Sequence, residues 1–377
     1  MSDGIELESV TARVFRFPLE VPVRTSFGTM RDRPAVLVEA RAKDGARGLG
    51  EVWCNFPSVG AEHRARLVNK ICAPLLTARS FSRPAEAFEH LTASLAVLAL
   101  QTGEDGPLAQ AIAGIDIALW DLAARQAGMP LNLFLGGEAV EEVGAYASGL
   151  NPDMPEKLAL QRARDGHTAF KLKVGFGEET DLTNVKRLRA VLGAGVRLMV
   201  DANQAWNLET AARMADRLAE HRIDWLEEPM RADTPPEDWR ALAARSPIKL
   251  AAGENIRGGN AFSTVISAGA ISVIQPDLAK WGGFTGCLPV ARSAIAAGRR
   301  YCPHFLGGGI GLIASLHLLA AAGGDGLLEI DSNPNPLREM MAAPFPALSD
   351  GRIIVPSEPG LGVTPDLAAL AAYEIHL

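Results

Sequence analysis

The sequence predicts an α/β protein in which an α+β capping domain precedes a TIM-type (β/α)7β barrel. The main observation is a series of short apolar, strand-like runs, each closed by a charged or titratable residue. The closing residues lie 23 to 28 positions apart, which fits one strand, one helix and two short loops, the repeat of a (β/α) barrel. In chain order they are Lys173, Asp201, Glu227, Glu254, Asp277, His304 and Glu329.

A different pattern precedes this repeat. Runs of alternating polar and apolar residues between positions 5 and 43 indicate strands, and Asp44-Gly45 followed by residues 48–53 indicates a hairpin that continues into a third strand. Over residues 61–126 the apolar residues fall largely at helical spacing, and Gly128 and Pro130 mark the end of this stretch. We therefore expect a first domain over residues 1–135, with three antiparallel strands and three or four helices.

The barrel is expected over residues 136–345. Residues 143–147 supply its first strand, and Leu135-Gly136-Gly137 is the expected hinge from the first domain. The remaining residues, 346–377, are strand-like and turn-rich but too short for another βα unit. We expect this segment to pack back on the capping domain.

The composition favours a globular protein that acts on a small molecule. Of the 377 residues, 48% are hydrophobic and 21% are charged, and the formal net charge is −7. Because no block rich in Lys or Arg is present, this charge argues against nucleic acid or an anionic membrane as partner. The longest apolar stretch, residues 307–324, contains His317 and several glycines, so it predicts a loop and a buried helix rather than a membrane span.

The N-terminus and the cysteines predict a cytoplasmic protein. The first residues are acidic and lack the basic and apolar stretches of a signal peptide. The cysteines have neither disulfide nor metal-ligand spacing, so we expect reduced, buried thiols. They are Cys54, Cys72, Cys287 and Cys302.

Three carboxylates, Asp201, Glu227 and Glu254, end consecutive predicted strands. The carboxyl ends of all barrel strands meet at one mouth, so these side chains are expected to converge. Hard oxygen ligands in threes, with no His or Cys among them, favour Mg²⁺, which keeps open positions for water or a substrate carboxylate. Each acid alone is more often structural or solvated, and it is the series that predicts a metal site.

Lys171 and Lys173 point to the same side of one predicted strand. A lysine pair usually lies on a solvated face, but inside a barrel such a pair is unfavourable unless anions are nearby. The pattern therefore favours a functional pair that faces the carboxylates.

Several motifs resemble those of the enolase superfamily, and the likeness covers nearly the whole chain. The helical residues 114–122, followed by 128–131 and 135–137, are similar to the signature that precedes the barrel in that superfamily. The resemblance implies a capped barrel enzyme that uses Mg²⁺ and acts on a small carboxylate, and we also expect a homo-oligomer. The barrel motifs are Lys171-Leu172-Lys173, Asp201-Ala202-Asn203-Gln204, Glu227-Glu228-Pro229, Gly253-Glu254-Asn255 and Gln275-Pro276-Asp277.

Asp277 and His304 sort the chain within this superfamily. Other subgroups place a second catalytic Lys at the sixth strand end, whereas Asp277 followed by His304 resembles the mandelate racemase subgroup. The resemblance implies that His304 faces Lys173 across the substrate and acts as base or acid. Asp277 would orient it, because a carboxylate fixes the imidazole tautomer and raises its basicity.

The implied chemistry has a physical reason. Removing a proton α to a carboxylate puts a second negative charge on an anionic group, and a metal on the carboxylate oxygens stabilises the enediolate as it forms. Lys171 would add positive charge, and Glu329, if protonated, would donate a hydrogen bond to the other oxygen. Lys173 can then remove the proton, provided that Lys171 and Mg²⁺ lower its pKa.

The resemblance implies that loops of the capping domain cover the barrel mouth and select the substrate. Their side chains indicate a polar, anionic substrate with one apolar wall, and Asn203 is expected at the substrate carboxylate or at a metal-bound water. Glu228 and Lys280 are expected to support the site from behind. The capping residues are Arg24, Ser26, Arg31, Arg33, Trp53 and Phe56.

The glycine-rich run 307–311 follows the seventh predicted strand. It resembles a phosphate cradle in composition but lacks the Lys-Ser/Thr of a P-loop. We interpret it as a flexible barrel loop.

The resemblance to the mandelate racemase subgroup, in which sugar-acid dehydratases are common, implies a Mg²⁺-dependent dehydratase that converts a sugar acid into a 2-keto-3-deoxy acid. Two opposed bases suit a racemase or epimerase of a 2-hydroxy acid equally well. A non-catalytic metal-binding scaffold is the alternative from another class, and the complete set of candidate ligands and bases argues against it.

Overall fold

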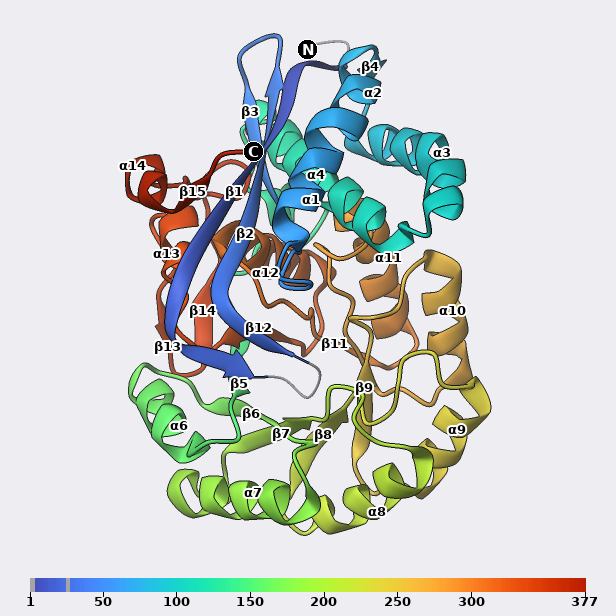
Figure 1. Ribbon diagram of the computed structural model, residues 1–377, viewed down its shortest axis with the longest axis vertical. Helices are drawn as coiled ribbons and strands as arrows, with labels where there is room; N and C mark the ends of the chain where they lie inside the picture. The colour runs from blue at the N-terminus through green and yellow to red at the C-terminus, as the bar shows by residue number, and fades with distance from the viewer. Residues whose placement is uncertain (1–3, 25–27) are drawn as a thin grey trace.

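The computed structural model describes residues 4–24 and 28–377, and a capping domain lies across one end of a barrel (Figure 1). Ser26 falls outside the described residues. The predicted fold class is confirmed, as the elements below show.

An antiparallel sheet forms the base of the capping domain. Its long strands are β1 (Ile5–Arg24), β2 (Thr29–Ala42) and β3 (Arg47–Val52), and the short strands β4 (Ser80–Phe81) and β15 (Glu374–Ile375) both pair with β1. Val10, Ala12 and Val14 alternate along β1 and are all buried, so one face of the sheet faces the helices.

Helices cover this buried face. The longest, α4, packs directly on β3 because Gly50 has no side chain: a Cβ there would lie 2.0 Å from the carbonyl oxygen of Gly114. By length and composition α4 could cross a membrane, but 72% of its apolar window is buried, as in a core helix. The helices are α1 (Gly60–Arg66), the π-helix η1 (Leu67–Cys72), α2 (Ala73–Thr77), α3 (Pro84–Thr102), α4 (Asp105–Gln126) and α5 (Leu131–Phe134).

In the barrel, parallel strands alternate with helices in the (β/α)7β order. Neighbours pair in chain order from β5 to β11, and β12 pairs with β5, which brings the two ends of the series together. The strands are β5 (Glu142–Leu150), β6 (Ala169–Lys173), β7 (Arg197–Asp201), β8 (Ile223–Glu227), β9 (Lys249–Ala252), β10 (Val273–Ile274), β11 (Arg300–Tyr301) and β12 (Leu327–Asp331). The helices are α6 (Pro155–Arg164), α7 (Glu178–Leu192), α8 (Leu208–Ala219), α9 (Pro236–Arg245), α10 (Gly259–Ala268), α11 (Gly283–Ala296) and α12 (Gly309–Ala322).

The C-terminal segment contacts both units. After α13 (Pro336–Met341), strands β13 (Leu348–Ser349) and β14 (Arg352–Ile354) form a hairpin whose second strand pairs with β5 of the barrel. Helix α14 (Leu367–Leu370) and the 3-10 turn η2 (Ala371–Tyr373) then lead to β15, which joins the capping sheet, where Glu374 pairs with Arg13 at 2.5 Å. The segment therefore ties the barrel to the capping domain.

The β1–β2 hairpin extends from the capping domain over the barrel (Figure 1). Arg33 on β2 forms a buried ion pair with Asp331 at the end of β12; their side chains are 3% and 6% exposed. Arg24, at the end of β1, lies 3.5 Å from Asp153, and that pair is largely exposed.

Replacing Arg33 by Ala is expected to lower the free energy of unfolding by about 3 to 5 kcal/mol, because the Asp331 carboxylate is left buried without its cation. Urea denaturation followed by circular dichroism measures the change. The matched variant Arg24→Ala removes an exposed pair and should change stability by less than about 1 kcal/mol. Equal effects of the two substitutions would contradict the prediction.

Candidate active site

The floor of the barrel mouth is a layer of buried side chains, one from each strand or from the residue that follows it. The next inward-facing position on a strand is two residues further on. Lys171 follows the floor residue Ala169 by two positions. In the same way Asp201 follows Met199, and Glu227 follows Trp225. Gln275, His304 and Glu329 likewise lie two positions after the floor residues Val273, Cys302 and Leu327, respectively. The floor residues are Tyr146, Ala169, Met199, Trp225, Ala251, Val273, Cys302 and Leu327.

The strand ladders place the predicted lysines and carboxylates side by side. Lys173 is in register with Asp201, and Asp201 with Glu227. The Lys173 Nζ lies 2.6 Å from Asp201 Oδ2, and the Lys171 Nζ lies 2.5 Å from Glu227 Oε1 and 2.7 Å from Glu329 Oε1. All of these residues are buried, so the charges form a network shielded from solvent.

Both lysines are held in the charged form. Burial lowers the pKa of Lys171, but Glu227 and Glu329 more than reverse this, and the pKa lies well above its ordinary value. Burial likewise lowers the pKa of Lys173, but the charge of Asp201 and its hydrogen bond outweigh burial. The pKa of Lys173 is therefore raised. The lowered pKa that sequence analysis required of Lys173 is therefore not present in this arrangement.

Glu329 is an acceptor in this structure. Burial raises its pKa, but Lys171 and His304 outweigh burial and lower it to about 2. Its oxygens accept hydrogen bonds from the Ser148 hydroxyl and, at 3.1 Å, from the Phe305 N–H. The arrangement does not support the protonated Glu329 considered from the sequence.

The predicted dyad is assembled. The His304 Nδ1 lies 2.8 Å from Asp277 Oδ2, and the other oxygen, Oδ1, accepts from the N–H groups of Ala279 at 2.9 Å and Lys280 at 3.1 Å. Because a carboxylate only accepts, Asp277 assigns the proton to Nδ1. Nε2 points into the mouth and contacts Glu254. Burial lowers the pKa of His304, but Glu254 and Glu329 raise it well above its ordinary value.

The donor set at the mouth has the chemistry of a magnesium site. Burial raises the pKa of Glu227 to about 7, and repulsion from Asp201 and Glu329 adds to the rise while Lys171 opposes it. A divalent cation would relieve this repulsion, and carboxylate oxygens are its preferred ligands. In residues 4–24 and 28–377, however, no three His, Cys, Asp or Glu side chains form a ready-made cage, so Asp201 and Glu254 would exchange contacts with Lys173 and His304 for the metal.

A cavity of about 210 Å³ opens above these groups, between the two domains. Lys173, Asn203 and His304 line it from the barrel, while Trp53 and Phe56 line it from the capping domain. The structure thus brings two of the three predicted substrate-binding residues, Asn203 and Trp53, to one cavity with both candidate bases.

The remaining arginines predicted to select substrate lie elsewhere. Arg24 is paired with Asp153, Arg31 is exposed on β2 and Arg33 is engaged with Asp331. None of the three lines the cavity. Within the described chain, the guanidinium groups named from the sequence therefore do not supply the cavity with positive charge.

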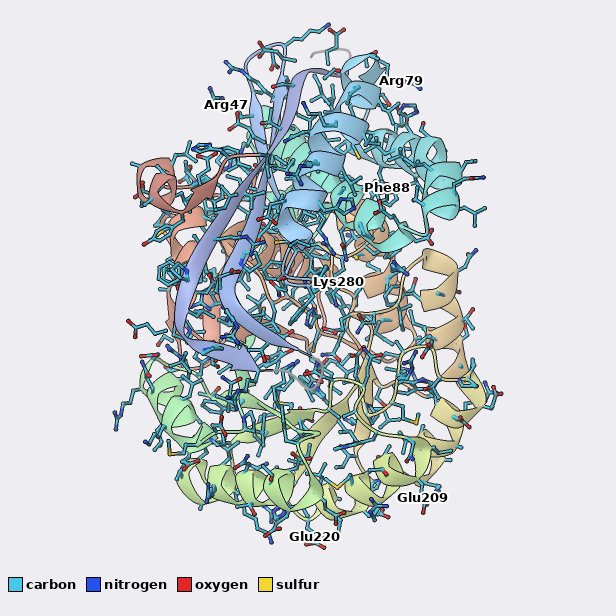
Figure 2. All side chains as sticks on the ribbon, viewed as in Figure 1. Arg47, Arg79, Phe88, Glu209, Glu220 and Lys280 are labelled. Carbon is cyan, nitrogen blue, oxygen red and sulfur yellow. The ribbon has the colours of Figure 1, made fainter. Side chains whose placement is uncertain are left out.

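Lys280 supplies part of that charge, and sequence analysis placed it behind the site. Its Nζ lines the cavity, 4.7 Å from the centre of the Trp53 ring and 3.5 Å from Glu254 Oε1. Figure 2 shows Lys280 near the middle of the molecule, where the capping domain meets the barrel. Its position three residues after Asp277 could have indicated that Lys280 lies near the barrel mouth. Nothing in the sequence indicated that Trp53 would cover it.

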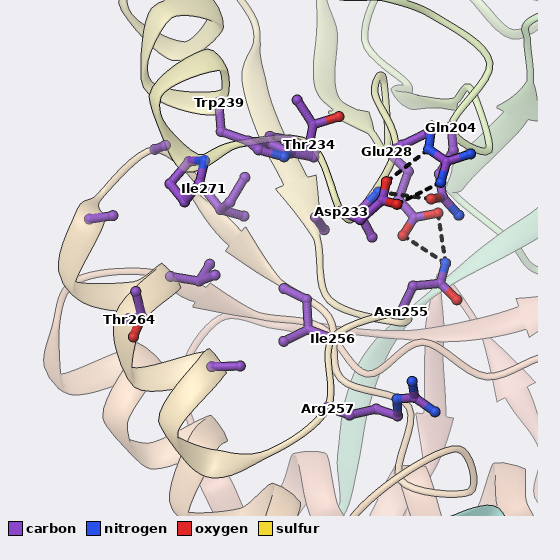
Figure 3. Close-up of a pocket in the computed structure, with 18 residues that line it drawn as sticks. Gln204, Glu228, Asp233, Thr234, Trp239, Asn255, Ile256, Arg257, Thr264 and Ile271 are labelled. Atoms are coloured by element: carbon purple, nitrogen blue, oxygen red, sulfur yellow. Dashed lines mark hydrogen bonds and ion pairs between the residues drawn. The ribbon is translucent and has the colours of Figure 1, made fainter. Parts of the chain in front are cut away.

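A larger cavity, of about 620 Å³, lies beside the mouth between α9 and α10 (Figure 3). Its walls are largely apolar, with Trp239 and Ile271 among them, and neither candidate base reaches it. Asn255 points toward Glu228 and donates to both of its oxygens, at 2.9 and 3.1 Å (Figure 3). Both candidate bases therefore line the smaller cavity, whereas Glu228 lines the larger one and is joined to the smaller one through Asn255, which lines both.

Fold and site together define a capped barrel with lysines, carboxylates and a His–Asp pair at its mouth, the class that the enolase superfamily comprises. Residues 9–136 match the family model "mandelate racemase / muconate lactonizing enzyme, N-terminal domain", and residues 153–369 match "enolase C-terminal domain-like". The chain belongs to the mandelate racemase/muconate lactonizing enzyme family of the enolase superfamily.

Three relatives illustrate the similarity. A D-galactarolactone cycloisomerase of Agrobacterium fabrum is 32% identical over 98% of this chain and 99% of its own length. A mandelate racemase/muconate lactonizing enzyme structure from Bordetella bronchiseptica RB50 is 56% identical, with a TM-score of 0.91, and covers 98% of this chain and 99% of that one. A mutant L-talarate/galactarate dehydratase, crystallised with magnesium and L-glucarate, is 27% identical, with a TM-score of 0.86, and covers 99% and 93%.

Proposed function

We propose that this protein is a Mg²⁺-dependent enzyme that removes the proton α to the carboxylate of a sugar acid and then expels an oxygen substituent from the neighbouring carbon. The observation that carries this proposal is that Lys173 of β6 and His304, which follows β11, line one cavity. The two candidate bases come from strands on different sides of the barrel, so a substrate between them would present its α-carbon to both.

Asp201, Glu227 and Glu254 are the residues that would hold the magnesium ion. When bound, the ion would stabilise the negative charge that develops on the substrate carboxylate. Its charge near Asp201 would also compete for the carboxylate that now raises the pKa of Lys173, which favours the neutral amine that a base requires.

The other residues bind and orient. Lys171, held by Glu227 and Glu329, places a fixed positive charge beside the position of the substrate carboxylate. Lys280 and Asn203 line the same cavity and are suited to the oxygens of a polyhydroxy acid. Glu329 contributes by fixing Lys171, with which it forms an ion pair at 2.7 Å, and by accepting a hydrogen bond from the backbone N–H of Phe305, the residue after His304.

The group that leaves distinguishes the candidate reactions. In a dehydratase a β-hydroxyl leaves as water, and His304 in its charged form can supply the proton. In a cycloisomerase the leaving oxygen remains attached to the same molecule, and the cycloisomerase relative makes this a specific second candidate. In a racemase nothing leaves and the opposite base returns the proton.

The deciding experiment incubates the protein and Mg²⁺ with open-chain aldonic and aldaric acids and with their lactones, in H₂O and in D₂O. A dehydratase yields a 2-keto acid lighter than its substrate by one water, and a cycloisomerase yields an isomer of the lactone. A racemase exchanges the α-proton and inverts the centre without loss of mass. Absence of turnover and of α-proton exchange across the panel would refute the proposed function.

Asp277→Asn is expected to keep the fold and the affinity for Mg²⁺ but to lower turnover about 10- to 100-fold. An amide has nearly the shape of the carboxylate, but it lacks the charge that supports the His304 imidazolium and can present its NH₂ to Nδ1. Steady-state kinetics measure the loss, and a Mg²⁺ titration serves as the control. Wild-type turnover in this variant would show that the dyad is not the working unit.

A further inference from the structure

The glycine-rich run 307–311 binds an anion, and that anion is part of the same chain. The carboxylate of Glu51, at the end of β3 in the capping domain, accepts hydrogen bonds from the N–H of Gly308 and, at 2.8 Å, from the N–H of Gly311. These N–H groups stand at the first turn of α12, where a negative charge is favoured. The run is thus held by a specific partner, and its residues 309–311, expected to lie in a loop, form the first turn of α12.

The glycines are shaped around this carboxylate. A Cβ on Gly308 would lie 2.7 Å from Glu51 Oε1 and 2.9 Å from the Met341 Sδ, and a Cβ on Gly307 would lie 3.0 Å from Glu51 Oε1. Side chains at these positions would displace Glu51. The sequence of the run therefore fits the bound carboxylate closely.

The same loop carries His304, and its backbone is bonded at successive residues. The His304 N–H donates to Pro276 O at 3.2 Å, the Phe305 N–H donates to Glu329, and the Leu306 carbonyl accepts from the side chain of Asn55 at 2.5 Å. Asn55, like Glu51, belongs to the capping domain. The loop from His304 to the start of α12 is thus held by the barrel at its first residues and by the capping domain at its last residues.

A parallel contact supports the loop that carries Asp277. The carboxylate of Asp116, on α4 of the capping domain, accepts from the N–H of Thr285 at 3.0 Å and from its hydroxyl at 2.6 Å, at the start of α11. The backbone N–H of Trp53 also donates to the Ala279 carbonyl at 3.3 Å. The capping domain therefore reaches the loops behind both members of the His304–Asp277 pair.

We propose that Glu51 is a positioning residue: it holds the loop between His304 and α12, so that docking of the capping domain fixes the orientation of His304. This inference rests on the proposed function for its catalytic consequence, but its structural part stands independently. Glu51 does not line the cavity, so it acts through the loop and not on the substrate.

A carboxylate at this buried position is unfavourable, and its two oxygens are offset by two backbone N–H donors. Burial raises the pKa of Glu51 to about 7, although the N–H groups of Gly311 and Gly308 oppose the shift. Glutamine has the same shape and carries no charge, but it offers a single acceptor oxygen to two N–H donors. Glu51→Gln is therefore a conservative variant that breaks one of the two bonds.

The first arm of the test is hydrogen–deuterium exchange of the full-length protein. We expect residues 305–311 to exchange faster in Glu51→Gln and in Gly308→Ala, which displaces the carboxylate from the opposite side, while residues 169–173 around Lys173 stay unchanged. The controls are Glu39→Gln, a carboxylate on the same sheet beside Arg47, and Gly259→Ala, where a Cβ meets nothing within 4 Å.

The second arm is kinetic. Both test variants should lower turnover roughly 10- to 100-fold with KM within about twofold of wild type, and α-proton exchange in D₂O should fall on the face served by His304 but not on the face served by Lys173. Unchanged exchange of residues 305–311 in folded variants, or faster exchange with wild-type turnover, would overturn the proposal. If wild-type protein turns over no acid sugar, the proposed function fails, and the deuterium-exchange arm still decides whether Glu51 holds the loop.

Discussion

Lys173→Ala and His304→Asn are each expected to lower turnover of the acid-sugar substrate at least about 100-fold, because each removes a group that moves a proton at the α-carbon. Both side chains line the cavity of about 210 Å³, and each is fixed by a buried carboxylate, Asp201 for Lys173 and Asp277 for His304. Steady-state kinetics with the substrate found in the panel measure the loss.

The two variants should differ in proton exchange. Whichever base performs the first step is needed for the α-proton to exchange with D₂O, so one variant should lose exchange and the other should retain it. Lys186→Ala, which removes an exposed lysine on α7, is the control and should retain full turnover. Full activity in either test variant would remove that residue from the mechanism.

Removal of divalent metal is expected to abolish turnover, and Mg²⁺ is expected to restore it. A bound metal would supply several kcal/mol of charge stabilisation at the substrate carboxylate, which corresponds to roughly 1,000-fold or more in rate. Asp201→Asn and Glu227→Gln should each raise the Mg²⁺ concentration needed for half-maximal activity, because a neutral amide is a weaker ligand than a carboxylate. Isothermal titration with Mg²⁺ gives a reading that does not depend on activity.

The control for the metal variants is Asp165→Asn, which removes a surface carboxylate paired with Arg162. It should leave both the Mg²⁺ affinity and turnover unchanged. Turnover that persists after exhaustive chelation, or wild-type Mg²⁺ affinity in both Asp201→Asn and Glu227→Gln, would contradict the assignment of these ligands.

The sequence alone predicted the barrel and the layer of polar residues at its mouth, because both follow from local spacing. A strand turns every second side chain inward, and the repeat returns to the mouth once per unit, so residues such as Lys171, Asp201 and Glu227 had to reach the same layer. The Asp277–His304 contact was implied by the resemblance to the mandelate racemase subgroup, and it forms because each residue lies three positions beyond one of two neighbouring strands, β10 and β11.

The contacts between the domains were decided only by the tertiary structure. Glu51 and Gly308 are 257 residues apart, and no periodicity links a carboxylate on a capping strand to a glycine run after the seventh barrel strand. The same holds for Lys280 beneath Trp53 and for Arg33 paired with Asp331. Local sequence determines which side chains a strand turns inward, whereas the docking of the capping domain on the barrel determines which distant charges meet.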